Sequence, residues 1–411
     1  MILDGNSVSA TNAPASGVRK RAFRKHEPVL DGIRGLAIIA VLLTHGVWAF
    51  RDTGLTKWII RPLTFGWCGV DLFFVLSGFL ITGILIETKQ ASNRASSFYM
   101  RRFLRIFPIY YLTLISVLVL SSYSGWLKSL LPFNSWTDRL GYFVYLQNWL
   151  PAIHGGINPT NILGHFWSLA VEEQFYLVWP WLVWAVPEKQ FWKMCALGMI
   201  CTFTLRVILV AMNGPHFWID VLTPTRGEGL LVGSALASLA AHGRKLSPRL
   251  LTWMGSVGLV LLVFIAAVDR AEFWNTDAGP YMYTIGVSAL ALFFGALVGS
   301  SQYEIPVITQ FLNAGWIRSF GKYSYGIYVY HVPVLFVLNY IAMTRLGLEL
   351  PLRTRYAVVH FAAMIALSYG TAWVSFKLIE GPLLRMKRHF VPVLALTYSE
   401  PALQAAPSKV S

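Results

Sequence analysis

The sequence is poor in charged residues. Only 13% of its 411 residues are Asp, Glu, Lys or Arg, whereas 55% are hydrophobic and 15% are aromatic, and the mean hydropathy is +0.55. Soluble domains average about 25% charged residues, so this chain has too few polar side chains to cover a surface in water. The composition indicates an integral membrane protein, whose backbone polar groups must be satisfied inside the bilayer.

Cysteines and long polar segments are also scarce. The three cysteines, Cys68, Cys195 and Cys201, are an odd number in apolar runs, and they predict neither a disulfide framework nor a metal site. No internal repeat and no long polar segment is visible. We expect one membrane domain over residues 28–388, between a basic tail (1–27) and a second tail (389–411), both disordered by composition. The first apolar run contains charges, so it is expected to be a span rather than a cleaved signal peptide.

Long apolar runs are abundant. A helix needs about 20 apolar residues to cross about 30 Å of hydrocarbon. The runs predict an all-α fold of about ten transmembrane helices, at residues 30–50, 66–86, 106–123, 166–186, 194–212, 222–241, 251–268, 280–299, 323–342 and 356–379. The stretch 141–153 is short and contains Gln147, Asn148 and Pro151, so we expect it to be interfacial or re-entrant.

The basic residues predict the orientation of these helices. With the N-terminus inside, 21 of the 34 Lys and Arg residues fall in inner segments and 10 in outer segments. This bias follows the positive-inside rule and predicts that both termini are cytoplasmic. The net charge of +15 is then mostly a consequence of topology, which argues against nucleic-acid binding.

The first predicted helix carries Arg34 and His45 among its ionisable residues. Such residues cost about 2.5–3.5 kcal/mol each in a membrane and are therefore functional candidates. Arg34 and His45 are eleven residues apart; at 100° per residue they share one helix face, roughly 16 Å apart along the axis. A long ligand could bridge them, with its anionic end on Arg34 and its reactive end at His45. The alternative is that Arg34 pairs with Asp31 and His45 is a hydrogen-bonded interior histidine.

The fourth predicted helix offers a carboxylate. His165, Glu172 and Tyr176 are seven and four residues apart and share one face. This helix is expected to start in the outer half of the membrane, at the same depth as His45. Glu172 could therefore orient or stabilise an imidazole there. The alternative is that acidic residues here only favour the helix N-terminus through its dipole.

Other polar groups lie within or near the ends of spans. Asp71 enters just inside the outer interface, and Ser77, which lacks the Gly-x-Ser-x-Gly pattern of a nucleophile, is expected to serve helix packing. Arg226 and Glu228 lie at an outer span end. His331 lies mid-span, where a single histidine is more often structural.

Three arginines cluster at the inner face, in FYMRRFLRIFPIYY (98–111): Arg101, Arg102 and Arg105. Guanidinium groups suit phosphates. The positive-inside rule explains the same residues nearly as well.

Seven motifs in order resemble the acyltransferase family 3 membrane proteins. They are LDGIRGLAIIAVLLTH, GVDLFFVLSGFLIT, FYMRRFLRIFPIYY, FWSLAVEEQFYLVWP, TPTRGEGLLVG, YSYGIYVYHVP and IEGPLLR, and they cover roughly residues 28–388. The resemblance implies ten core spans. It also implies transfer of an acyl group, often acetyl, from acyl-coenzyme A (acyl-CoA) to a hydroxyl of a polysaccharide, an oligosaccharide or a macrolide.

The resemblance also assigns roles to residues. The family's signature of a basic residue, a ten-residue gap and a histidine falls on Arg34 and His45, and the glutamate of its Trp-Ser-Leu segment falls on Glu172. Glu228 departs from the pattern, since an Asp is more usual after the Arg. Some relatives carry a further esterase-like C-terminal domain; none follows the last span in this sequence, so we expect the ten-span part to perform transfer unaided.

The chemistry agrees with these roles. A thioester is already activated, so the enzyme mainly needs a base for the acceptor hydroxyl and help for the oxyanion, and neutral imidazole suits the base near pH 7. We expect His45 and Glu172 to be catalytic. Acyl-CoA is expected as a cytosolic co-substrate, with no permanently bound cofactor and no metal. Its phosphates are expected to contact Arg34, Arg101, Arg102 and Arg105.

The acceptor is expected to contact groups nearer the outer face, namely Asp71, His165, Arg226, Glu228 and His331. The expected location is the bacterial cytoplasmic (inner) membrane. The main alternative function is a transporter or flippase that uses intramembrane Arg, His and Glu as a substrate path or proton relay, and a catalytically silent membrane binding protein is the third. The absence of inverted repeats argues against the transporter.

Overall fold

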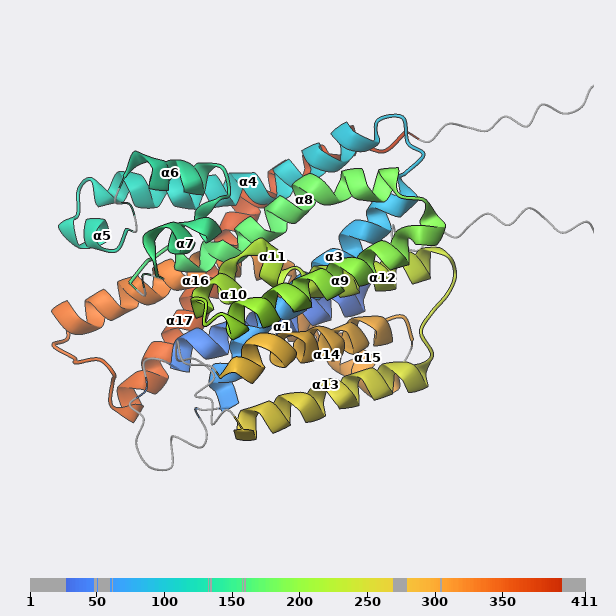
Figure 1. Ribbon diagram of the computed structural model, residues 1–411. Coiled ribbons are helices and arrows are strands. Elements are labelled where there is room, and N and C mark those ends of the chain that lie inside the picture. Colours follow the sequence, from blue (N-terminus) through green and yellow to red (C-terminus); the bar gives the residue numbers. More distant parts are fainter. Residues whose placement is uncertain are drawn as a thin grey trace, which may run out of the picture.

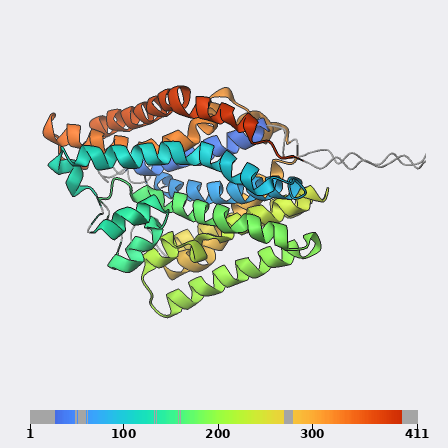
Figure 2. The ribbon, with the colours of Figure 1, turned by 90° about the horizontal axis from the view of Figure 1, so that it is seen from above.

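The computed structural model describes residues 27–47, 50, 60, 62–131, 133, 135–156, 158, 160–268, 279–303 and 305–393. Within these residues every regular element is a helix, and the isolated β-bridge joins Phe50 to Leu352. The long helices lie side by side in one bundle (Figures 1 and 2). In the view from above, α17 and α9 lie at opposite edges of the bundle (Figure 2).

Ten helices correspond to the ten predicted spans. They are α1 (Pro28–Val47), α3 (Gly69–Glu87), α4 (Arg94–Ser121), α8 (Trp167–Ala185), α9 (Glu188–Ala211), α12 (Glu228–Ala241), α13 (Pro248–Val268), α14 (Val287–Ser300), α16 (Gly315–Thr344) and α17 (Thr354–Ser375). Eight of the ten are long and apolar enough to cross a membrane, if the helical turns that flank some of them are included. The other two, α8 and α12, are not among these eight. The helical membrane fold is thus confirmed, while the orientation of the termini stays a prediction.

The helix α12 is shorter than its predicted span because its start is split off. Residues Thr223–Arg226 form a separate turn, α11, and α12 begins at Glu228. Short π-helical turns likewise adjoin two long helices, Met282–Gly286 before α14 and Phe376–Glu380 after α17. The remaining short helices are α10 (His216–Val221), α15 (Pro306–Leu312) and α18 (Gly381–Arg385).

The weak apolar stretch 141–153 does not form a long helix. It contributes to α6 (Trp136–Phe143), η2 (Gln147–Trp149) and α7 (Leu150–His154), all too short to cross a bilayer. Together with α5 (Gly125–Ser129) they gather at one end of the bundle (Figure 1). The two amides that interrupt the apolar pattern hold this segment in place: Gln147 Nε2 donates to the Phe166 carbonyl (2.8 Å) and Asn148 Nδ2 to the Val221 carbonyl (3.1 Å).

Glycines let two pairs of helices touch backbone to backbone. A Cβ at Gly321 of α16 would overlap the carbonyl oxygen of Asp31 in α1. A Cβ at Gly233 of α12 would overlap the carbonyl oxygen of Val75 in α3. Small residues at such crossings are typical of membrane helices, because close packing replaces the missing hydrophobic effect.

Candidate active site

A cavity of about 880 Å³ lies between α1, α3, α4, α8 and α16. On α3 its lining residues run from Val70 to Ile84. At 1.5 Å per residue the cavity therefore extends roughly 20 Å along that helix. It is large and deep enough to bury a cofactor-sized ligand.

One end of the cavity is strongly basic. Its lining includes the six basic residues Arg34, Arg101, Arg102, Arg105, Lys245 and Lys387. They come from the N-terminal halves of α1 and α4, from the segment after α12 and from the 3₁₀ turn Met386–His389. All four arginines that were predicted to hold the phosphates of a donor thus meet in one place.

Arg34 fits both interpretations of its role that the sequence left open. Its Nη1 atom donates to Asp31 Oδ1 at 2.6 Å, one turn away, as the structural alternative required. Arg34 and Asp31 nevertheless both line the cavity. The ion pair therefore leaves the guanidinium at the cavity wall, where an anionic ligand can reach it.

The middle of the cavity holds a hydrogen-bonded trio. Ser77 Oγ donates to Glu172 Oε1 (2.7 Å), and the Tyr176 hydroxyl donates to Ser77 Oγ (3.0 Å). The guanidinium of Arg102 lies over the Tyr176 ring, 5.4 Å from its centroid. Glu172 is therefore held by a serine inside the cavity, whereas the sequence argument placed it against an imidazole; its catalytic role stays a prediction. Ser77, expected only to pack helices, orients this carboxylate.

The deep end of the cavity is closed by two hydroxyl groups. Ser168 on α8 and Tyr328 on α16 both line the cavity, and their hydroxyls form a short hydrogen bond. Both also lie within hydrogen-bonding distance of the backbone carbonyl of His165, the tyrosine at 3.0 Å and the serine at 3.3 Å. Because each hydroxyl has one hydrogen, one of them donates to this carbonyl while the other donates to its neighbouring hydroxyl. The ring of Phe73 packs edge-on against Tyr328.

Three histidines cluster directly behind this hydroxyl pair. The ring of His331 lies 4.7 Å from that of His45 and 5.0 Å from that of His165, centroid to centroid. The Tyr328 ring lies 5.5 Å from both His165 and His331. The sequence singled out each of these histidines separately, and the fold brings them together. Among the described residues no group of three His, Cys, Asp or Glu side chains is arranged to hold a metal ion.

Backbone carbonyls set the tautomers of the cluster. His45 Nδ1 faces the Val41 carbonyl (3.0 Å) and His331 Nδ1 faces the Tyr328 carbonyl (2.7 Å). A carbonyl oxygen only accepts, so in the neutral rings these nitrogens carry the hydrogen and Nε2 carries the lone pair. His45 is thus held in a form that can accept a proton at Nε2.

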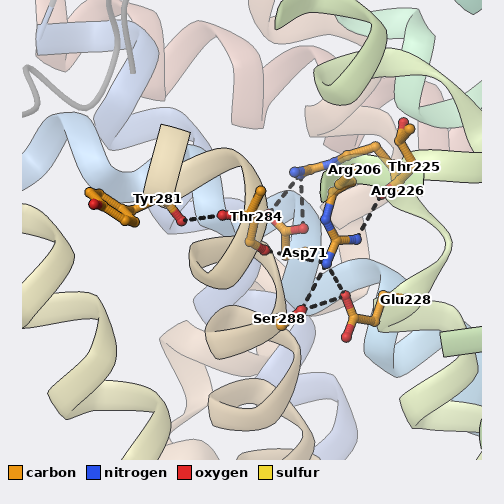
Figure 3. A network of polar contacts seen from close by, with 8 residues as sticks. All are labelled: Asp71, Arg206, Thr225, Arg226, Glu228, Tyr281, Thr284 and Ser288. Atoms are coloured by element: carbon orange, nitrogen blue, oxygen red, sulfur yellow. Dashed lines mark hydrogen bonds and ion pairs between the residues drawn. The ribbon is translucent and has the colours of Figure 1, made fainter. Parts of the chain in front are cut away.

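The outer polar residues form a separate, buried ion-pair network (Figure 3). Arg226 Nη2 donates to both carboxylate oxygens of Asp71, at 2.8 and 2.9 Å. Arg206, which is fully buried, pairs with Glu228 and also donates to the Thr225 carbonyl (3.0 Å). Of the predicted substrate contacts, Asp71 and Arg226 therefore bind each other and Glu228 binds Arg206, and all three lie outside the lining of the cavity.

Sequence reasoning missed several lining residues, namely Ser168, Glu173, Lys245, Tyr328 and Lys387. Tyr328 could have been found, because it precedes His331 by one helical turn in a motif already singled out. Ser168 likewise stands in the Trp-Ser-Leu segment. The two lysines looked like topological charges, and nothing in the sequence pattern separates them from the others.

Comparisons with known proteins show which proteins the chain resembles. The chain is 28% identical over 382 residues to the peptidoglycan O-acetyltransferase OatA of Listeria monocytogenes, covering 88% of this chain and 56% of the relative. It is 27% identical over 337 residues to the putative peptidoglycan O-acetyltransferase YrhL of Bacillus subtilis, covering 77% and 50%. A putative O-acetyltransferase of Staphylococcus aureus is 28% identical over 348 residues, covering 79% and 53%.

The chain thus spans about half the length of the curated relatives it matches. No solved structure matches it. The family model described as an acyltransferase domain matches residues 27–375, which is most of the chain. The chain is therefore an integral membrane protein that belongs to acyltransferase family 3.

Proposed function

We propose that the protein transfers an acyl group, acetyl in the simplest case, from acyl-CoA to a hydroxyl group of a glycan, with His45 as the general base. The observation that carries this proposal is one cavity with a basic end and a deep end that adjoins the histidine cluster. The relatives named above are all named O-acetyltransferases, some of them putative, and two of the names specify peptidoglycan.

The basic end suits the donor. Coenzyme A carries phosphates at one end and its thioester at the other, and guanidinium groups bind phosphate through paired hydrogen bonds. Arg34 and His45 lie roughly 16 Å apart along α1. A donor held by its phosphates at Arg34, Arg101, Arg102 and Arg105 extends its acyl group toward Tyr328.

The histidine cluster suits the acceptor. His45 Nε2 takes the proton of the acceptor hydroxyl as the hydroxyl oxygen attacks the thioester carbonyl carbon. The C–S bond then breaks, and the leaving thiolate takes up one proton, so that one ester and one free thiol are formed. Because acyl-CoA is made in the cytosol, the donor enters from the cytoplasmic face of what we propose to be the bacterial inner membrane.

Purified protein with radiolabelled acetyl-CoA and peptidoglycan fragments or other glycans tests the reaction. His45→Ala should lower transfer by about 10²- to 10⁴-fold, the usual cost of losing a general base, while the protein remains inserted and folded. The matched control is His360→Ala, which removes a buried histidine of α17 outside the cavity lining and should keep activity. Near-normal transfer by His45→Ala would end the assignment of the base and direct attention to His331.

A further inference from the structure

The two hydroxyls at the deep end of the cavity have no part in the reaction as described so far. Tyr328 and Ser168 are buried, line the cavity and stand between it and the histidine cluster. They come from two different helices, α16 and α8, and both point at one backbone carbonyl, that of His165. Their place is therefore where the acyl end of a donor held at the basic end arrives.

We propose that the Tyr328 hydroxyl donates a hydrogen bond to the oxyanion formed during acyl transfer, and that Ser168 positions it. This inference rests on the proposed function. When the acceptor oxygen bonds to the thioester carbon, the C=O electron pair moves onto the carbonyl oxygen. Donors held in a site that excludes water stabilise that charge more than water does.

The hydrogen bonds of the pair allow this change at little cost. In the resting arrangement the Tyr328 hydroxyl donates to the His165 carbonyl at 3.0 Å, and the Ser168 hydroxyl faces the same carbonyl at 3.3 Å. When Tyr328 turns to the oxyanion, Ser168 keeps the carbonyl satisfied. A buried acceptor left without a partner would cost about 1–3 kcal/mol, and the shared carbonyl avoids that loss.

Nearby groups are consistent with this role. The Tyr328 ring lies beside that of His331, which in turn lies beside that of His45, so one histidine separates the proposed oxyanion donor from the proposed base. In this proposal the acceptor oxygen, whose proton passes to His45, attacks the carbonyl carbon while the carbonyl oxygen accepts from the Tyr328 hydroxyl. When the oxyanion collapses, the electron pair returns to the carbonyl, the C–S bond breaks and the thiolate leaves into the cavity.

Kinetics of Tyr328→Phe test the assignment, because this change removes only the hydroxyl oxygen. We expect kcat to fall about 10²- to 10³-fold, as for loss of an oxyanion donor, with little change in KM for acyl-CoA. Ser168→Ala should lower kcat by less. The matched control is Tyr330→Phe. Tyr330 lies on the same helix as Tyr328 but outside the cavity lining, and its hydroxyl also forms a hydrogen bond to a serine, Ser375, at 3.0 Å.

Binding of two unreactive donor analogues separates a catalytic contact from a structural one. The first has a methylene group in place of the thioester sulfur and keeps the carbonyl; the second, S-ethyl-CoA, has no carbonyl. Tyr328→Phe should lower the affinity for the ketone analogue by about 2- to 10-fold, which is the contribution of one hydrogen bond, and leave the affinity for S-ethyl-CoA unchanged.

The oxyanion assignment would be overturned if Tyr328→Phe lowered the affinity for both analogues equally, or if its kcat were no lower than that of Tyr330→Phe. The proposed function would still stand in either case. If Tyr328→Phe does not fold, as judged by its thermal unfolding, Ser168→Ala decides the question by the same two measurements. Failure of the unaltered protein to bind either analogue would contradict the use of acyl-CoA, and with it this assignment.

Discussion

The buried ion pair between Asp71 and Arg226 allows a direct separation of structural from functional roles. Each residue is 4% exposed, and the two carboxylate oxygens take bonds of 2.8 and 2.9 Å from one guanidinium nitrogen. The aromatic rings of Trp67 and Trp167 flank the same guanidinium at 5.9 and 5.7 Å. Asp71→Asn therefore removes the carboxylate that the buried guanidinium of Arg226 binds directly.

The expected size of the effect follows from this burial. Breaking a buried pair by changing one partner costs about 3–5 kcal/mol, because the remaining charge is uncompensated. Replacing both partners with apolar residues of similar volume is often neutral or stabilising. We expect Asp71→Asn and Arg226→Met each to lower the thermal midpoint strongly, and the double variant Asp71→Leu with Arg226→Met to regain most of the loss.

The assay combines thermal unfolding in detergent, followed by tryptophan fluorescence, with acetyl transfer on the same preparations. Recovery of both stability and transfer in the double variant indicates a structural pair. Recovery of stability without transfer indicates that Asp71 or Arg226 also contacts substrate, as the sequence suggested. A single Asp71→Asn variant as stable as the unaltered protein would refute the reasoning from burial.

Two further changes have definite expected outcomes. Arg34→Ala should raise the acyl-CoA concentration needed for half-maximal transfer and leave the acceptor concentration needed unchanged, and Arg34→Lys should retain part of the function. Calorimetry with acyl-CoA checks this. If the double change Asp31→Asn with Arg34→Gln restored the activity lost in either single variant, Arg34 would instead be a purely structural residue. Burial raises the pKa of Asp220, in the short helix α10, to about 6. A raised carboxyl pKa means that the folded state binds the proton more tightly, so stability is lost as the pH rises from about 4 to above 6. Asp220→Asn should therefore raise the thermal midpoint at pH 7, by an amount that shrinks as the pH falls to 4; a gain that is the same at both pH values would contradict this.

The sequence predicted the helices well because membrane spans are specified locally. Each needs only a long apolar run, and the bilayer allows few other structures. The prediction was less accurate where the chain departs from a simple span: the separate turn α11 before Glu228 cannot be recognised from hydropathy alone. The amides Gln147 and Asn148, by contrast, were correctly taken as a sign that 141–153 does not cross.

The site was only partly predictable, because its contacts join helices that are far apart in sequence. Periodicity shows that Glu172 and Tyr176 share a face, but not that Ser77, 95 residues earlier, meets both. Likewise, the sequence shows that Arg226 and Glu228 lie together at one span end, but not that they pair with Asp71 and Arg206. Single-helix geometry identifies candidates, and only the crossing of helices decides which candidates meet.

The glycine contacts of the bundle limit which parts of the cavity can move. With Gly321 pressed against the backbone of Asp31, α16 cannot slide or swing away from α1 without losing contact along both helices. Arg34 and His45 on one helix, and Tyr328 and His331 on the other, thus belong to a single rigid frame. Entry and exit of the proposed donor must then be accommodated by the remaining walls, α3, α4 and α8, while the groups on α1 and α16 keep their spacing. Substitution of Gly321 by a larger residue would consequently misalign base and donor together, rather than close the entrance.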